Sequence, residues 1–350
     1  MQKTCSNHRR LTLHGPAMGT RWSVTCDAAP GLDAQALHRT LAASVQQVDA
    51  QMSPWLPSSD LNRLNHAPPG AWLALPAEIL EVLACALDIS RLSRGAFDPA
   101  VGALVDAWGF GPARDAPDAA AIRAAASAAH PPAHKMLELD MAAGRARKHA
   151  PLQLDLCGIA KGYAVDRMAA ALQRHGVRHA LAALDGELRA VGGQAGGQPW
   201  AVAVERPEAG RRAVHSVIEM RDLSVATSGD YRRYLEIGGA RVAHTMDAGR
   251  AAPLRNDVAS VTVLARTCMH ADAWATALLV AGPDTGLALA QRMGLEALWL
   301  LRREGALAAM GLGRFGIDET TGGAPWPGAR APVSGHGAAT RRPDYPADTL

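Results

Sequence analysis

The spacing of hydrophobic residues changes within residues 152–172. From Leu152 to Leu156, leucines alternate with polar residues, and this two-residue period is typical of a strand. After Gly162 the apolar residues recur every three or four positions, which predicts an amphipathic helix. Gly158 and Gly162 bracket the change of period. The pattern therefore predicts a strand, a tight glycine turn and a helix, in that order.

The same two periods divide the rest of the chain into strands and helices. Helical spacing predicts helices at residues 32–52, 76–93 and 115–133, one that starts near residue 269 and ends at Pro283, and one at residues 284–293. Alternating or buried apolar runs predict strands at residues 11–26 (as two strands), 136–148 (as a hairpin), 180–191, 200–205, 214–220, 225–234 and 258–265, with the last strand at 296–301. Residues 1–10 and 320–350 show neither period, so we expect a flexible N-terminus and a disordered tail.

Composition and charge narrow the class of protein. The chain has 350 residues, 48% of them hydrophobic, which is enough for one large domain or two closely packed ones. The formal net charge of +3 is spread along the sequence, so it does not indicate a nucleic acid or a membrane surface as partner. The five cysteines are widely separated and form no CxxC pair, so neither a disulfide framework nor a zinc site is predicted.

Targeting signals are not evident in the sequence as written. No apolar run reaches the ~20 residues of a transmembrane segment. The N-terminal residues lack the hydrophobic core of a signal peptide. We therefore expect a cytoplasmic protein, with a periplasmic, inner-membrane-anchored location as the alternative if the true start lies upstream.

The glycine corner combines features that bind anions. A helix that starts there presents free backbone N–H groups and the positive end of its dipole, and Lys161 adds a positive charge. The two glycines allow a phosphate to approach the backbone closely. The alternative is that these glycines only turn the chain.

A carboxylate and a hydroxyl lie one helical turn apart at Asp272 and Thr276. Oxygen ligands of this kind suit Mg²⁺, which takes one or two protein carboxylates and completes its octahedron with water and phosphate. The alternative is an Asp that caps the helix or faces solvent, beside a Thr that bonds back to the helix backbone.

Two further residues have possible chemical roles. His244 lies at a predicted strand end beside Thr245 and Asp247, where a neutral imidazole could act as a base. The alternative is a structural histidine. Trp55 lies in a proline-rich loop and is either a ring-stacking residue or a cap on the core.

Seven sequence motifs occur along the chain in one order: MGTRWSV, MSPWLPSSDLNRLN, GAFDPAVGALVDAWGFGP, DLCGIAKGYAVDR, VATSGDYRRY, HTMD and MHADAWATALLVAGP. This series resembles the ApbE family of FAD:protein FMN transferases, and the resemblance covers residues 18–301. It implies an α+β fold of the ApbE type (T-fold-like), with mixed sheets flanked by helices in two intimately packed lobes. The corresponding domain is expected to span residues 11–319.

The resemblance also implies a reaction. Such an enzyme splits the pyrophosphate of its substrate FAD and joins the FMN half, through a phosphoester, to a Thr or Ser hydroxyl of an acceptor flavoprotein, and AMP leaves. The implied cofactor is Mg²⁺, with Mn²⁺ possible. Two other functions remain open, an FAD pyrophosphatase that releases FMN and AMP, and a non-catalytic FAD-binding protein.

Site residues are carried over from the motifs one by one. The positions that match FAD contacts are Met18, Trp55, Ala96, Phe97, Asp98, Asp155, Lys161 and Met246. The positions that match the metal ligands are Asp272, Thr276 and the backbone carbonyl of Gly158, and His244 matches the proposed base. The chain departs from the family pattern at Cys157, where a Gly is common, at Ala248, where a Pro is usual, and at Ala275, where the family sometimes has a second carboxylate. The last departure implies that the metal depends on fewer protein ligands.

Overall fold

An antiparallel sheet of eight strands forms the centre of the protein in the computed structural model, which describes residues 8–128, 131–208, 211–237, 239–303 and 306–316. The strand order is β1-β2-β6-β7-β10-β15-β16-β17, and each neighbouring pair is antiparallel. The strands are β1 (Arg9–Ala17), β2 (Thr20–Ala28), β6 (Ala180–Leu184), β7 (Glu187–Val191), β10 (Ser224–Gly229), β15 (Val258–Ala265), β16 (Glu296–Arg303) and β17 (Ala306–Leu312).

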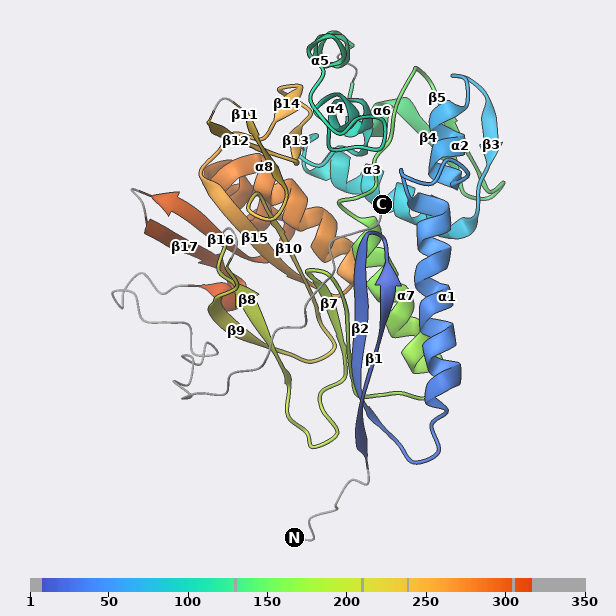
Figure 1. The fold of residues 1–350 in the computed structure, drawn as a ribbon, viewed down its shortest axis with the longest axis vertical. Helices are drawn as coiled ribbons and strands as arrows, with labels where there is room; N and C mark the ends of the chain where they lie inside the picture. The colour runs from blue at the N-terminus through green and yellow to red at the C-terminus, as the bar shows by residue number, and fades with distance from the viewer. Residues whose placement is uncertain (1–7, 129–130, 209–210, 238, 304–305, 317–350) are drawn as a thin grey trace.

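Three long helices form a layer against this sheet (Figure 1). They are α1 (Ala34–Met52), α7 (Ala160–Arg174) and α8 (Cys268–Met293), with α7 between the other two. Gly282 has φ 75° and ψ 179°, so α8 is two helical segments joined at a kink just before Pro283. This break is the boundary that the sequence predicted between two helices.

Smaller elements surround the layer. At the upper end of Figure 1 lie α2 (Asp60–His66), α3 (Ala77–Leu92), η1 (Pro99–Val101), α4 (Gly102–Ala107), α5 (Ala119–Ser127), α6 (Ala133–Met136) and the small sheet of β3 (Trp72–Ala74), β5 (Arg145–Lys148) and β4 (Leu137–Asp140). Three hairpins are formed by β8 (Trp200–Glu205) with β9 (Val214–Met220), β11 (Tyr234–Ile237) with β12 (Ala240–Ala243), and β13 (Met246–Asp247) with β14 (Ala252–Pro253). The short helix η2 (Gly313–Phe315) follows β17.

The central sheet is covered on both faces. On β16, Trp299 belongs to the core shared with the helices, whereas Leu298 and Leu300 belong to a second apolar cluster that includes residues of the β8–β9 hairpin. This double burial explains why β15 is apolar along nearly its whole length, a pattern typical of strands buried on both faces.

Most predicted elements are present, and the α+β class is confirmed. The predicted strand at residues 152–156 is wrong, because the segment joins no sheet. Its backbone bonds to other partners: Leu154 N donates to Asn65 Oδ1 (2.7 Å), and Asp155 N donates to the Pro99 carbonyl (2.7 Å). The leucines are buried as predicted, but their alternation reflects an extended segment held by loops.

Two other boundaries differ from the prediction. β17 follows β16, so residues 296–301 do not form the last strand. β1 starts at Arg9, so the last two residues of the segment expected to be flexible pair with β2. The predicted disordered tail at residues 320–350 lies outside the described residues.

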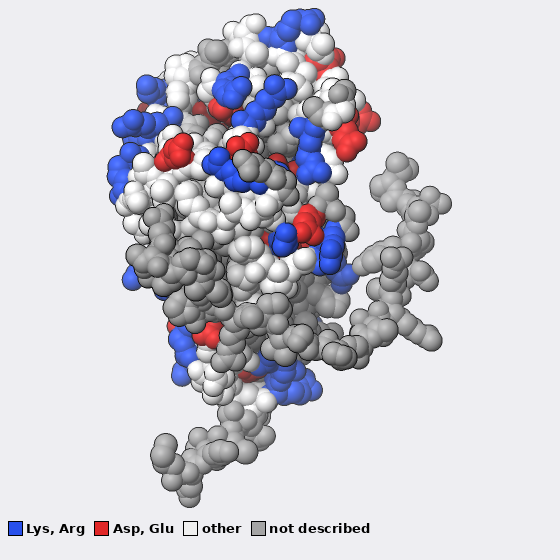
Figure 2. Space-filling view, turned by 90° about the vertical axis from the view of Figure 1, so that its left-hand side faces the viewer, with Lys and Arg blue, Asp and Glu red and all other residues white. Residues whose placement is uncertain are grey.

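The surface and the longest helix bear on possible partners. On the face drawn in Figure 2, basic side chains lie among acidic ones and form no single continuous basic surface. Within the described chain, α8 alone has the length and apolar composition of a transmembrane segment. Most of its residues are buried against the sheet and α7, as expected of a core helix.

Candidate active site

A cavity of about 1060 Å³ opens where the turns of the central sheet meet the upper helices and the hairpins. The chain segments that line it are far apart in sequence, from the β1–β2 turn to α8. All twelve residues predicted for the site lie on its wall: Met18, Trp55, Ala96, Phe97, Asp98, Asp155, Gly158, Lys161, His244, Met246, Asp272 and Thr276. The structure thus brings the predicted set together, while the role of each member stays a prediction.

The glycine corner is a point of close contact between α7 and α8. A Cβ added to Gly162 would lie 2.3 Å from the backbone oxygen of Cys268, so only glycine fits there. The Gly162 N–H donates to Asp272 Oδ2 at 2.9 Å. A Cβ on Gly158 would lie 3.2 Å from Thr276 Oγ1, which places the corner backbone beside that hydroxyl. The corner therefore joins the two predicted metal-binding side chains to the start of α7.

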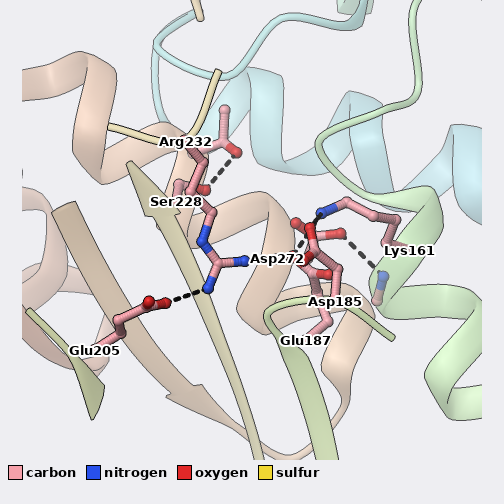
Figure 3. A network of polar contacts seen from close by, with 9 residues as sticks. Lys161, Asp185, Glu187, Glu205, Ser228, Arg232 and Asp272 are labelled. Atoms are coloured by element: carbon pink, nitrogen blue, oxygen red, sulfur yellow. Dashed lines mark hydrogen bonds and ion pairs between the residues drawn. The ribbon is translucent and has the colours of Figure 1, made fainter. Parts of the chain in front are cut away.

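Lys161 does not carry an uncompensated charge. Its Nζ lies 2.9 Å from Glu187 Oε1 and 3.6 Å from Asp185 Oδ2 (Figure 3). Burial would lower the pKa of Lys161, but the charges of Glu187 and Asp272 raise it above its usual value, so the ammonium stays protonated. Its interaction with a phosphate would therefore be shared with these carboxylates.

The floor of the cavity is rich in carboxylates. Glu187 is only 2% exposed, and burial raises its pKa to about 8 although the Lys161 charge opposes this rise. Burial also raises the pKa of Asp272, which is 3% exposed, to about 6. Arg232 bonds to Asp185 Oδ1 at 2.8 Å and also to Glu205 (Figure 3). Counted formally, the cations Lys161, Arg212 and Arg232 face four carboxylates, a balance of −1 (3 − 4).

The oxygens at this floor fit a hard divalent cation. Asp272 offers a carboxylate, and Thr276 offers a hydroxyl that also lies 3.0 Å from Ser228 Oγ. The Gly158 backbone lies beside the Thr276 hydroxyl. Glu187 Oε2 is buried and has no hydrogen-bond partner among the described residues. The described residues contain no group of three His, Cys, Asp or Glu side chains arranged around a metal position. A cation here would thus need oxygens from a ligand or from water.

The upper wall of the cavity is aromatic at its entrance. Trp55 is 46% exposed, and the guanidinium of Arg233 lies 5.7 Å from the centre of its ring. Phe97, which also lines the cavity, is buried and approaches the glycine corner. Met18 is the first central residue of the β1–β2 turn and has a positive φ of 50°. Ring stacking at the entrance therefore depends on Trp55, with an apolar wall behind it.

The two acidic residues predicted to accept hydrogen bonds from FAD already accept them from the backbone. Asp98 caps η1 by accepting from Ala100 N (2.9 Å) and also accepts from Ala133 N (3.2 Å). Asp155 Oδ1 accepts from Cys157 N at 2.6 Å. Asp155 can still offer remaining lone pairs to a ligand, because a carboxylate has about four acceptor positions.

His244 is held in one orientation between β12 and β13. Its Nδ1 lies 3.0 Å from the carbonyl oxygen of Arg233, and because a carbonyl can only accept, Nδ1 carries the proton. Nε2 is then an acceptor, and no described residue donates a hydrogen bond to it. Burial lowers the pKa of His244, and the Arg233 charge lowers it further, so the ring is neutral at pH 7. A neutral imidazole with a free Nε2 is the form that a general base requires.

Several charged residues of this cavity were not identified as site residues from the sequence, among them Asp185, Glu187, Glu205, Arg232 and Arg233. Arg232 and Arg233 occur in the motif VATSGDYRRY, and the other three lie in segments predicted as strands. No periodicity shows that a turn between two strands will face a helix start, so the pairing of Lys161 with Glu187 was not predictable.

A family model, a protein of known name and a solved structure all match this chain over most of its length. The family model described as "ApbE family" matches residues 18–299. A protein of Vibrio cholerae named FAD:protein FMN transferase is 35% identical over 304 residues, which cover 84% of this chain and 88% of that protein. The solved structure of "Flavin Transferase ApbE from Vibrio cholerae" superposes with a TM-score of 0.79 at 32% identity and covers 87% of this chain and 97% of that one.

A second solved structure agrees. The apo form of the flavinyl transferase ApbE from Pseudomonas stutzeri matches with a TM-score of 0.77 at 35% identity, over 87% of this chain and 95% of that chain. The match includes the corner, the His244 strand end and the α8 residues, which all lie within the range of the family model. On this match and on the shared fold, the chain belongs to the ApbE family.

Proposed function

We propose that this protein transfers the FMN moiety of FAD to a Thr or Ser hydroxyl of an acceptor protein and releases AMP. The observation that carries the proposal is the shared cavity, where a neutral His244 with a free Nε2 lines the same space as the oxygens of Asp272 and Thr276. The names of the relatives support the same reaction.

His244 would act on the incoming nucleophile. Its Nε2 takes the proton from the acceptor hydroxyl while the hydroxyl oxygen attacks the phosphorus of the FMN half. The P–O bond to the AMP phosphate breaks, and AMP leaves with the bridging oxygen. The hydrogen bond from Nδ1 to the Arg233 carbonyl orients the ring and favours its protonated form in the transition state.

A divalent cation, Mg²⁺ or Mn²⁺, would be held by Asp272, Thr276 and the Gly158 carbonyl. When bound, it supplies positive charge that neutralises the pyrophosphate and the charge that develops on the leaving AMP. Lys161 adds a further cation at this floor, and Gly162 fixes the Asp272 carboxylate through its N–H. Trp55 and Phe97 would bind a ring of FAD.

The proposal is tested by incubating the purified protein with FAD and Mg²⁺, with and without a candidate acceptor domain. A matched acceptor variant, in which the Thr or Ser is replaced by Ala, is the control. We expect the acceptor mass to increase by one FMN phosphoester, with AMP released in equal amount, and no change in the Ala variant. FMN and AMP formed equally well without acceptor would instead establish a pyrophosphatase, and intact bound FAD would establish a binding protein.

A further inference from the structure

Arg233 lies at the entrance of the cavity, in the segment between β10 and β11. Its guanidinium lies 5.7 Å from the centre of the Trp55 ring. Its one hydrogen bond within the described structure is long, 3.5 Å from Nη2 to the Phe110 carbonyl. The side chain is exposed, and its charge acts on the proposed base, His244, whose ring contacts the Arg233 backbone.

Arg233 also differs in charge compensation from the other cations of the cavity. Four Lys and Arg residues of the described chain line it. Lys161 pairs with Glu187 and Asp185; Arg232 pairs with Asp185 and Glu205; Arg212 lies 3.6 Å from Glu205. No carboxylate of the described residues lies within the 4.0 Å of an ion pair with Arg233. Its charge reaches Asp155 only at longer range.

The backbone carbonyl and the side chain of Arg233 can act independently. The carbonyl accepts the hydrogen bond from His244 Nδ1 and so orients the ring. The guanidinium is free to bind an anion that approaches the same point. An anion bound by the guanidinium would therefore lie near His244, whose ring is oriented by the backbone carbonyl of Arg233.

We propose that the Arg233 side chain binds the phosphate of the FMN half of FAD and places it for attack beside His244. This inference rests on the proposed function. A guanidinium binds phosphate through two parallel N–H···O bonds, which fixes orientation as well as charge. FAD brings a pyrophosphate with two negative charges into a cavity whose floor is rich in carboxylates, and of the four cations that line it Arg233 is the one that no carboxylate of the described residues compensates.

The test compares FAD with riboflavin, which has the same ring system but no phosphate. Binding of both is measured through the fluorescence of the flavin, in wild type, Arg233→Met and Arg233→Lys. The matched control is Arg241→Met, because Arg241 also stacks on an aromatic ring, at 4.1 Å from the centre of Tyr234, but does not line the cavity.

We expect Arg233→Met to weaken FAD binding by roughly 10- to 100-fold, the loss typical of hydrogen bonds to a charged group, and to leave riboflavin binding unchanged. Arg233→Lys should restore part of the FAD affinity. Both variants keep the carbonyl that orients His244. The pH profile of transfer should therefore stay the same in Arg233→Lys, which keeps the charge, and its acidic limb should move to higher pH in Arg233→Met, because the Arg233 charge that lowers the pKa of His244 is lost.

Equal weakening of FAD and riboflavin in Arg233→Met would overturn the inference, since it would mean that the residue only supports Trp55. Unchanged FAD affinity would overturn it as well, and in that case wild-type transfer activity shows that the proposed function still holds. If the wild type transfers no FMN in the acceptor assay, the proposed function itself fails, and that result is independent of the Arg233 variants.

Discussion

The close contact of α7 with α8 at Gly162 predicts that Gly162→Ala lowers the free energy of unfolding, whereas Gly→Ala within a helix usually raises it. In a helix, Gly→Ala normally stabilises a protein by about 0.5–1 kcal/mol, because alanine loses less backbone entropy. At Gly162 the added Cβ would lie 2.3 Å from the Cys268 backbone oxygen and 2.8 Å from Asp272 Cβ. Ordinary contact begins at 3.4 Å, so the two helices would have to separate by about 1 Å.

The free-energy cost of the steric clash should exceed the gain in helix propensity. Both helices are packed in the main core, and overpacking of this kind costs about 1–3 kcal/mol. We therefore expect Gly162→Ala to lower the free energy of unfolding by about 1–2 kcal/mol, as measured by urea denaturation. The movement also displaces the Asp272 carboxylate, which accepts the Gly162 N–H, so divalent-cation stimulation of transfer should weaken.

The control for this prediction is Gly196→Ala. A Cβ added to Gly196 meets no atom within 4 Å, so the expected change is within about 0.5 kcal/mol. The reasoning is refuted if Gly162→Ala unfolds at the same or a higher urea concentration than wild type while its response to Mg²⁺ is unchanged.

Three further variants test separate parts of the site. His244→Ala should keep FAD affinity and lower the transfer rate by roughly 10²- to 10⁴-fold. Because burial lowers the pKa of His244, the wild-type rate should stay constant as pH falls to the usual histidine value of 6.5 and drop only below it, which a pH–rate profile measures. Asp272→Asn should raise the Mg²⁺ concentration needed for half-maximal transfer by more than about 10-fold, and a chelator should weaken binding of FAD more than that of riboflavin. Trp55→Ala should weaken both flavins to the same extent, by about 1–3 kcal/mol if the ring stacks on the indole, and Trp55→Phe should lose less; titrations that show no change would assign Trp55 to capping the core.

Much of the fold was predictable because its elements are local. The periods of α1, α3 and α7 are set by one buried face each, and the break at Gly282 follows from the adjacent proline. The prediction of a strand at residues 152–156 was wrong because alternation of apolar and polar residues shows which side chains are buried, and not which backbone groups are paired. The side chain of Asn65 accepts a hydrogen bond from Leu154 N, 89 residues away in the sequence, and no local pattern predicts such a contact.

The motifs predicted which residues belong to the site. The twelve predicted residues share one cavity, although they come from separate elements. Their electrostatic relations could not be read from the sequence. Lys161 was expected to add a positive charge at an anion-binding corner, and the structure shows that Glu187 and Asp185 already compensate that charge. This pairing depends on the β6–β7 turn reaching the start of α7, which is a property of the sheet register.

The charge balance at the cavity floor explains why such a site needs more than its own side chains to hold a pyrophosphate. The cations Lys161, Arg212 and Arg232 are outnumbered by the carboxylates of Asp185, Glu187, Glu205 and Asp272, so the floor has no surplus positive charge to attract an anion. The raised pKa values of Glu187 and Asp272 have the same origin, because burial among carboxylates favours their neutral forms. A divalent cation that arrives with the pyrophosphate would keep Asp272 ionised, and Asp272 would in turn hold the cation. Substrate and metal would then bind as one unit at the floor, while Arg233 at the entrance supplies the positive charge that the floor lacks.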